Sequence, residues 1–144
     1  MKPLAAVLTA AAVAWVALIV AAPSAAGGRL PLLGSVTYQI GSRICHQRPE
    51  RSFHLAGTQM PVCARCFGLY AGGASGLVLA WAFRRWSTRT IRSSLFVAAL
   101  PIALSVGLEW LRIFGTSNVF RWLTGVPLGL VAGFAIVNLL RAPD

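Results

Sequence analysis

VCARCFGLYAGGASGLVLAWAF, which occupies residues 62–83, decides the fold of this chain. Its length matches the roughly 20 residues that a helix needs to cross the hydrocarbon of a bilayer. Pro61 stands just before the stretch, at a first-turn position, and Arg84 and Arg85 end it. We therefore predict a transmembrane helix over residues 62–83.

A row of small residues marks one face of this predicted helix. Glycines recur there at intervals of four residues, and the same spacing returns near the end of the chain: Gly68, Gly72 and Gly76, then Gly125, Gly129 and Gly133. Small residues at this spacing let two helix backbones approach closely in a membrane. The two rows predict tightly packed helices rather than a wide aqueous pore.

Three further apolar stretches have the length of a span: about residues 4–22, 94–114 and 119–140. The first is closed by Pro23, and its core is longer than that of a usual signal peptide. We therefore expect it to be retained as a span rather than cleaved. Pro101 predicts a kink in the next stretch. The short connection 115–118 requires the last two helices to lie antiparallel.

Residues 24–62 form the one long loop of the predicted fold. Apolar side chains recur within it at helical spacing: Leu33, Val36, Ile40 and Ile44. This pattern is typical of a short amphipathic helix lying at the membrane interface. We expect that helix to end at Cys45 and the remainder of the loop to be irregular.

The composition supports the same architecture. Of the 144 residues, 57% are hydrophobic and 11% charged, which is too apolar for an ordinary soluble domain of this size. We expect an all-α integral membrane bundle of about four transmembrane helices, forming a single transmembrane domain over residues 1–144.

The net charge of +10 comes from thirteen basic residues, twelve of them Arg, against three acids: Glu50, Glu109 and Asp144. The basic residues lie in loops and at span ends, so we expect anionic lipid headgroups or phosphate ligands, and no nucleic acid, as partners. The densest basic segment contains Arg84, Arg85, Arg89 and Arg92. The positive-inside rule places that segment, and with it both termini, in the cytoplasm, with the protein in the plasma membrane.

Three cysteines and a histidine lie around the predicted interfacial loop. Cys63 and Cys66 are three residues apart at a helix start, so both thiols share one face, where the helix dipole and Arg65 favour the thiolate. With Cys45 and His46 they supply the four ligands of a tetrahedral zinc site. His54 is an alternative fourth ligand. The alternative interpretation is that the cysteines bind no metal and only pack as small apolar residues.

Glu109 is an ionisable residue inside an apolar span, which is costly unless it is paired. The short connection 115–118 brings it to the depth of Arg121, so we predict an ion pair at the membrane face that carries the cysteines. The residues expected to bind an anion or lipid headgroup there are Arg48, Arg51, Arg65, Glu109, Asn118, Arg121 and Thr124. The structural alternative is that the pair only locks the helical hairpin and that the arginines anchor the protein.

These residues carry a resemblance to a family of small prokaryotic predicted membrane proteins, the domain of unknown function 2085. It covers roughly residues 40–140. The matching elements are Cys45-His46, Pro49, Arg51-Ser52-Phe53, Gly57, the run from Pro61 to Cys66, Gly68, Tyr70, Gly72, Ser117-Asn118, Arg121 and Thr124-Gly125. The family usually has an aspartate where this chain has Glu109. The resemblance implies a membrane protein, and it does not indicate what activity the protein has.

The leading hypothesis is a membrane protein that binds zinc through Cys45, His46, Cys63 and Cys66. The ion would pin the long loop to the bundle beside an Arg/Glu pocket. One alternative is a membrane thiol oxidoreductase using Cys63 and Cys66 with Cys45, although such enzymes usually need a fourth cysteine. Another is a transporter or channel subunit, which would require a homo-oligomer to build a solvated path. The sequence lacks a nucleotide-binding loop, a serine nucleophile motif and paired acids, so it does not favour most classes of hydrolase or kinase. It does not decide whether the protein is an enzyme of another kind.

Overall fold

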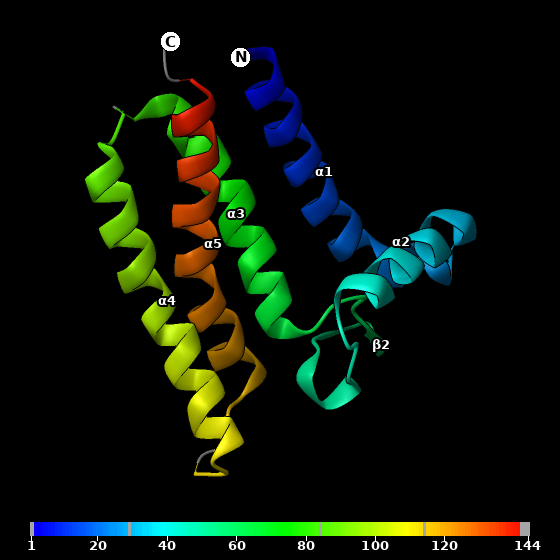
Figure 1. Cartoon of the computed structure of the whole chain (residues 1–144). Helices are drawn as coiled ribbons and strands as arrows, with labels where there is room; N and C mark the ends of the chain where they lie inside the picture. Colours follow the sequence, from blue (N-terminus) through cyan, green and yellow to red (C-terminus); the bar gives the residue numbers. More distant parts are fainter. Residues whose placement is uncertain (1, 29, 84, 114, 142–144) are drawn as a thin grey trace.

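The computed structural model describes residues 2–28, 30–83, 85–113 and 115–141. Five α-helices make up most of the described chain (Figure 1). They are α1 (Lys2–Ala26), α2 (Pro31–Ile44), α3 (Ala64–Ala82), α4 (Thr88–Trp110) and α5 (Asn118–Leu140). A short 3-10 turn, η1 (Pro49–Arg51), and a two-stranded antiparallel hairpin, β1 (His54–Leu55) and β2 (Thr58–Gln59), lie between α2 and α3. The predicted all-α architecture is confirmed.

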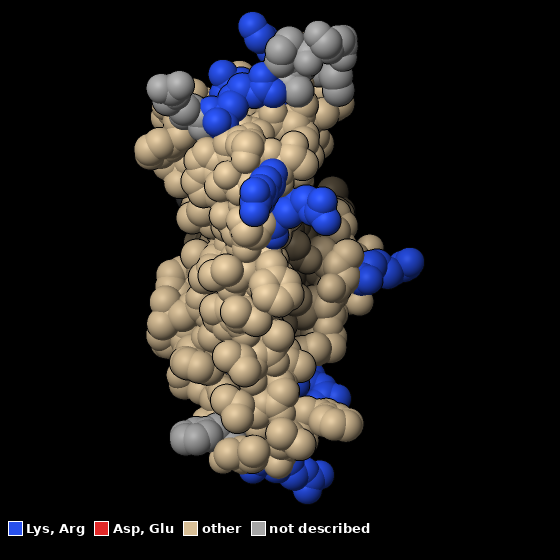
Figure 2. All heavy atoms as spheres, turned by 60° about the vertical axis from the view of Figure 1, so that its left-hand side comes forward, with Lys and Arg blue, Asp and Glu red and all other residues tan. Residues whose placement is uncertain are grey.

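Three of the described helices, α1, α4 and α5, are long and apolar enough to cross a bilayer. The helix α3 is not among these three, and its 19 residues correspond to about 28 Å. It nevertheless runs beside α5 along the bundle (Figure 1). The predicted count of about four spans thus holds as an approximate number. Figure 2 shows a mostly uncharged face, with Lys and Arg side chains at both ends, in its upper part and at mid-height on one edge.

The helices α3 and α5 interlock through the two glycine rows. A Cβ on Gly72 would collide with the carbonyl oxygen of Val126 on α5, and one on Gly129 would collide with that of Leu69 on α3. Each row therefore lies against the backbone of the other helix, as the spacing predicted. The remaining spans pack around this pair, α4 against α5 and α1 mainly against α3.

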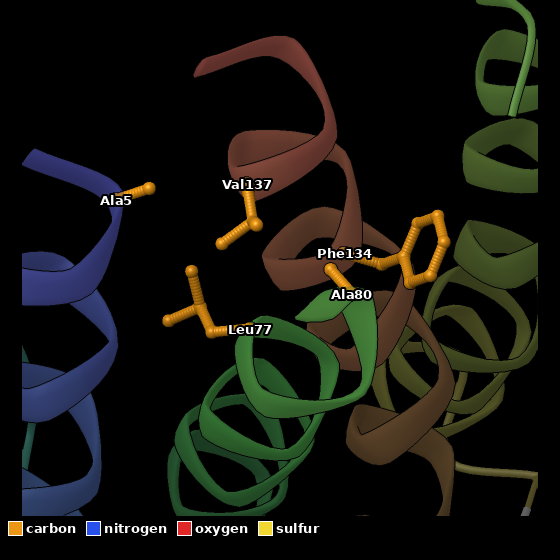
Figure 3. Packing of buried hydrophobic residues seen from close by; sticks show 5 residues of the cluster. All are labelled: Ala5, Leu77, Ala80, Phe134 and Val137. Atoms are coloured by element: carbon orange, nitrogen blue, oxygen red, sulfur yellow. The ribbon is translucent and has the colours of Figure 1, made fainter. Parts of the chain in front are cut away.

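Two hydrophobic clusters fasten α1 to the bundle. Near the N-terminus, the side chains of Ala5, Leu77, Ala80, Phe134 and Val137 pack together (Figure 3). At the other end of α1, Ile19 is fully buried against Met60 and Val62 of the loop. The second cluster joins the loop to the first helix, so the loop packs on the bundle.

The predicted interfacial helix is present as α2, and it ends at Cys45 as expected. The apolar residues that predicted it are all exposed: Leu33, Val36, Ile40 and Ile44. Its buried face consists of the small residues Gly34, Thr37 and Gly41. Because the apolar side chains point away from the protein, α2 is arranged to meet the bilayer surface.

Three sequence-based boundaries were wrong. Pro23 does not close α1, which continues to Ala26 with the proline inside the helix. Pro61 lies outside α3, whose N-cap is Cys63. Arg89 and Arg92 belong to α4 rather than to a loop, since Ser87 caps that helix by accepting a hydrogen bond from the Thr90 N–H at 3.2 Å.

Candidate metal and anion site

Hydrogen bonds fold the loop between α2 and α3 onto the end of the bundle. Gln47 adopts a left-handed backbone conformation (φ 46°), and its Nε2 donates to the carbonyl oxygens of Tyr38 at 3.0 Å and Pro61 at 2.7 Å. Gln59 Nε2 donates to the Gln47 carbonyl at 2.6 Å. Burial raises the pKa of Tyr38, so its hydroxyl stays protonated and donates to the carbonyl of Gln59. These bonds hold the end of α2 beside the start of α3.

This arrangement brings the three cysteines together in what we term the thiol cluster: Cys45, Cys63 and Cys66. Their Sγ atoms all lie within 4.8 Å of one another, and all three are free thiols. Cys45 caps the C-terminus of α2, Cys63 caps the N-terminus of α3, and Cys66 follows within the first turn. The Cys63 N–H donates to Cys45 Sγ at 3.2 Å. The end of α2 and the start of α3 are therefore in contact through the sulfur atoms of their cysteines.

The thiol cluster has the chemistry and nearly the spacing of a zinc site. With a Zn–S bond of about 2.3 Å, tetrahedral geometry separates sulfur atoms by about 3.8 Å. Separations of up to 4.8 Å are thus close to those of a loaded site. The free N–H groups at the start of α3 also favour thiolates, which are the form that binds metal.

Neither histidine belongs to the cluster found among the described residues. His46 is exposed, and its Nδ1 accepts a hydrogen bond from the Arg48 N–H at 3.1 Å. His54 is also exposed, in β1. The structure therefore gathers three of the four predicted metal ligands.

Glu109, in the last turns of α4, lies at the centre of a group of arginines. Its Oε1 is 2.9 Å from Arg121 Nε and 3.2 Å from Arg65 Nη2, and its Oε2 is 4.0 Å from Arg51 Nη1. The Thr116 hydroxyl also donates to Oε1. Only 9% of the Glu109 side chain is exposed. The pair with Arg121 is the one that the sequence predicted, and the other two arginines join it from α3 and the loop.

Further hydrogen bonds tie these charges to three parts of the fold. Arg65 Nη2 donates to Ser105 Oγ at 2.7 Å, which links α3 to α4. Arg121 Nη1 donates to Asn118 Oδ1 at 2.9 Å, and Asn118 Nδ2 donates to the Ser52 carbonyl at 2.9 Å. Thr124 Oγ1 lies 3.5 Å from Ser105 Oγ. The ion-pair group thus holds α3, α4, α5 and the loop together.

Beside Glu109 lies an open cavity of about 340 Å³, which we term the Arg/Glu cavity. It is lined by Arg51, Arg65, Val106, Glu109, Trp110 and Arg112. Arg65 also has a buried Nε without a hydrogen-bond partner among the described residues. The cavity therefore offers several donors around a single carboxylate.

The predicted anion-binding residues fall into three groups. Arg51, Arg65 and Glu109 line the cavity, and Asn118, Arg121 and Thr124 support them through hydrogen bonds. Arg48 is exposed and contributes its carbonyl, which accepts from Ser52 Oγ at 2.8 Å.

Sequence reasoning did not place Ser105, Thr116 or Arg112 in the site. Ser105 stands four residues before Glu109 on the same helix, and this spacing is the signal that identifies it. Thr116 and Arg112 flank the turn between α4 and α5, where no periodic pattern points inward.

The thiol cluster and the Arg/Glu cavity are adjacent through α3. Arg65 stands between Cys63 and Cys66 in the first turn, so one helix start supplies both sulfur atoms and a cavity-lining guanidinium. Any change that moves the start of α3 therefore acts on both.

Residues 45–135, which hold the thiol cluster and all the residues that line the Arg/Glu cavity, match the model of a family described as "Predicted membrane protein (DUF2085)". The chain belongs to this family. The matched segment begins at Cys45, so the family contains the region in which the cysteines and Glu109 meet.

Two archaeal proteins are similar to the chain, and both carry the description "uncharacterized". One, from Methanocaldococcus jannaschii, is 34% identical over 102 residues, which is 69% of this chain and 63% of that protein. The chain thus spans less than two thirds of the length of that relative. The other, from Methanothermobacter thermautotrophicus, is 30% identical over 96 residues, which is 66% of this chain and 84% of that protein. No solved structure matches the chain.

Proposed function

We propose that this membrane protein binds one zinc ion through Cys45, Cys63 and Cys66 and uses it to hold an anion-binding pocket in shape. The observation that carries the proposal is the convergence of three free thiols, from two segments 18 residues apart, within 4.8 Å of one another. Three cysteine sulfurs from two segments of chain are the donor set of a structural zinc site, in which the cation offsets the charge of the thiolates.

The fourth ligand in this proposal is His46, which follows Cys45 directly. Its imidazole is exposed, and its Nδ1 accepts a hydrogen bond from the Arg48 N–H, so a rotation toward the sulfur atoms would replace a single exposed contact. His54 is the alternative, and it avoids asking two consecutive residues to bind one ion.

The ion's role is structural in this proposal. It would join the end of α2 to the start of α3 and so hold the loop and Arg65 in place. The binding chemistry would then reside in the Arg/Glu cavity, whose ligand is an anion or a lipid headgroup. We place the protein in the plasma membrane with both termini in the cytoplasm.

Elemental analysis of the detergent-purified protein, together with a thiol count, tests the metal proposal. We expect about one zinc per chain in the unaltered protein and little metal in Cys63→Ser, because a thiolate ligand is lost. His46→Gln should weaken zinc retention during chelator titration and His54→Gln should not, and the reverse result would assign the fourth ligand to His54. Full stoichiometric metal in Cys63→Ser would contradict the proposal.

A membrane thiol oxidoreductase is the second candidate, because Cys63 and Cys66 are close enough to be considered a redox pair with Cys45 as the shuttle. In that case a metal-free protein would show a Cys63–Cys66 disulfide under oxidising conditions in thiol trapping. Zinc retention with three reduced thiols would eliminate this candidate. For the third, a transporter subunit, the close packing of α3 against α5 leaves no room for a water-filled path between these two described helices.

A further inference from the structure

We propose that the ligand of the Arg/Glu cavity is a phosphate monoester carried by a membrane amphiphile, with its phosphate beside Arg51 and Arg65 and its apolar part against Val106 and Trp110. This inference rests on the proposed anion pocket and names the class of its ligand. It follows from the charge balance of the site, the geometry of guanidinium groups and the direction in which the cavity opens.

The charge balance requires a further anion. Three guanidinium groups, of Arg51, Arg65 and Arg121, share the single carboxylate of Glu109, and each ion pair in the described residues ends on that carboxylate. The cluster therefore has two positive charges in excess, and Arg112 adds another at the cavity wall. A phosphate monoester carries about −1.5 to −2 charges near pH 7, which would offset most of this excess.

The donor geometry also favours phosphate. Arginine presents a planar fork of N–H donors that suits phosphate oxygens better than a point charge does. Arg65 lines the cavity, and its Nε has no partner among the residues that the structure describes. Arg51 is about one third exposed, and its Nη1 is as far as 4.0 Å from Glu109 Oε2. Because this contact is long, the Arg51 guanidinium retains donors for a ligand.

The position of the cavity favours an amphiphile over a free ion. Val106 and Trp110 are one turn apart on α4, and both are exposed, Trp110 to 84%. They line the same cavity as the arginines, and α4 is long and apolar enough to span the bilayer. A ligand with its phosphate at the charged end can therefore continue onto the lipid-facing surface of the helix. Tryptophan at the end of a span marks the depth at which headgroups lie.

Lipid binding can be measured on the full chain in nanodiscs or by native mass spectrometry in detergent. The probes are phosphatidic acid, phosphatidylglycerol and phosphatidylcholine at equal mole fraction, with inorganic phosphate as a competitor. We expect phosphatidic acid to bind more tightly than phosphatidylglycerol, because the latter phosphodiester has one charge. Phosphatidylcholine should not bind specifically, and inorganic phosphate should displace the lipid only at much higher concentration.

Arg51→Gln should weaken phosphatidic acid binding about tenfold or more, the loss expected for one charge-assisted hydrogen bond. Arg89→Gln removes the same charge from the opposite end of α4 and should leave binding unchanged. Trp110→Ala should weaken binding of the lipid and leave inorganic phosphate binding intact. Thermal unfolding of each variant verifies that it is folded.

The outcomes separate this inference from the proposed pocket. Equal affinity for inorganic phosphate and phosphatidic acid would overturn the amphiphile assignment, and equal binding of both anionic lipids would overturn the monoester assignment. Either result would leave an anion pocket standing. If no anionic probe binds, or if Arg89→Gln and Arg51→Gln weaken binding equally, the pocket itself is refuted.

Discussion

Glu109 is the residue on which the polar end of the bundle depends. Its carboxylate accepts hydrogen bonds from Arg65 and Arg121, which belong to different helices. Only 9% of the Glu109 side chain is exposed. Removing one partner of a buried ion pair leaves the other charge without compensation, which costs more than the pair itself contributes. At this site three guanidinium groups would lose their only carboxylate partner among the described residues.

We expect Glu109→Gln to lower the free energy of unfolding by about 3 kcal/mol, at the low end for a broken buried pair because Arg51 is partly exposed. The measurement is thermal or chemical unfolding in detergent. Glu50→Gln is the control, since the Glu50 side chain is exposed and only its carbonyl approaches Arg121, at 3.5 Å. Added phosphate should restore part of the lost stability by supplying a negative charge. Equal unfolding midpoints for the two variants would contradict this account.

Sequence reasoning found the pair of Glu109 with Arg121 because only a short turn separates them. It did not find the contact with Arg65, which lies 44 residues away along the chain. A short turn limits where its flanking residues can lie, whereas a contact between α3 and α4 depends on how both helices pack on α5.

At the scale of elements, the interlocked pair α3 and α5 is the part of the fold that local spacing determines best. The glycine rows are repeated on both helices, and each lies against the backbone of the other. Such contacts stabilise membrane helices through close packing, because lipid offers no hydrophobic driving force for association.

Gly72→Ala should destabilise the bundle by about 1–3 kcal/mol, because its new methyl group would meet the Val126 carbonyl and force the helices apart. Gly107→Ala on α4 is the matched control: a Cβ there has nothing within 4 Å, and alanine favours the helix by roughly 0.5–1 kcal/mol over glycine. Unfolding in detergent compares the two variants. A neutral or stabilising Gly72→Ala would disprove the close approach of α3 and α5.

At the scale of the whole molecule, polar chemistry is concentrated at one end. The hairpin and the connection between α4 and α5 lie toward the end of the bundle opposite the N- and C-termini (Figure 1). The thiol cluster and the Arg/Glu cavity are built around the start of α3 and the last turns of α4. The other end carries Lys2, Arg85, Arg89, Arg92 and Arg141. Each end carries basic residues, so the proposed orientation depends on the basic residues around the start of α4, where Arg85 precedes the helix and Arg89 and Arg92 lie in its first turns.

We predict that the hairpin end faces outward and both termini face the cytoplasm. A protease site inserted between Ala56 and Gly57, an exposed turn with positive φ at both residues, should be cut by added protease in intact cells. The same site appended after residue 144 should be cut only after lysis. The reverse pattern would invert the assigned orientation.

Hydrophobic run lengths, glycine spacing and the CxxC motif were enough to predict the membrane bundle, its helix pairing and the region of the site. These features are properties of contiguous residues, because span length and helix periodicity need no knowledge of distant contacts. Packing of α3, α4 and the loop decided the rest. It placed Arg65 and Arg51 on Glu109, brought Cys45 to the start of α3 and left His46 apart from the sulfur atoms. Side chains that meet across distant segments are positioned by the sum of many contacts, which no single stretch of sequence contains.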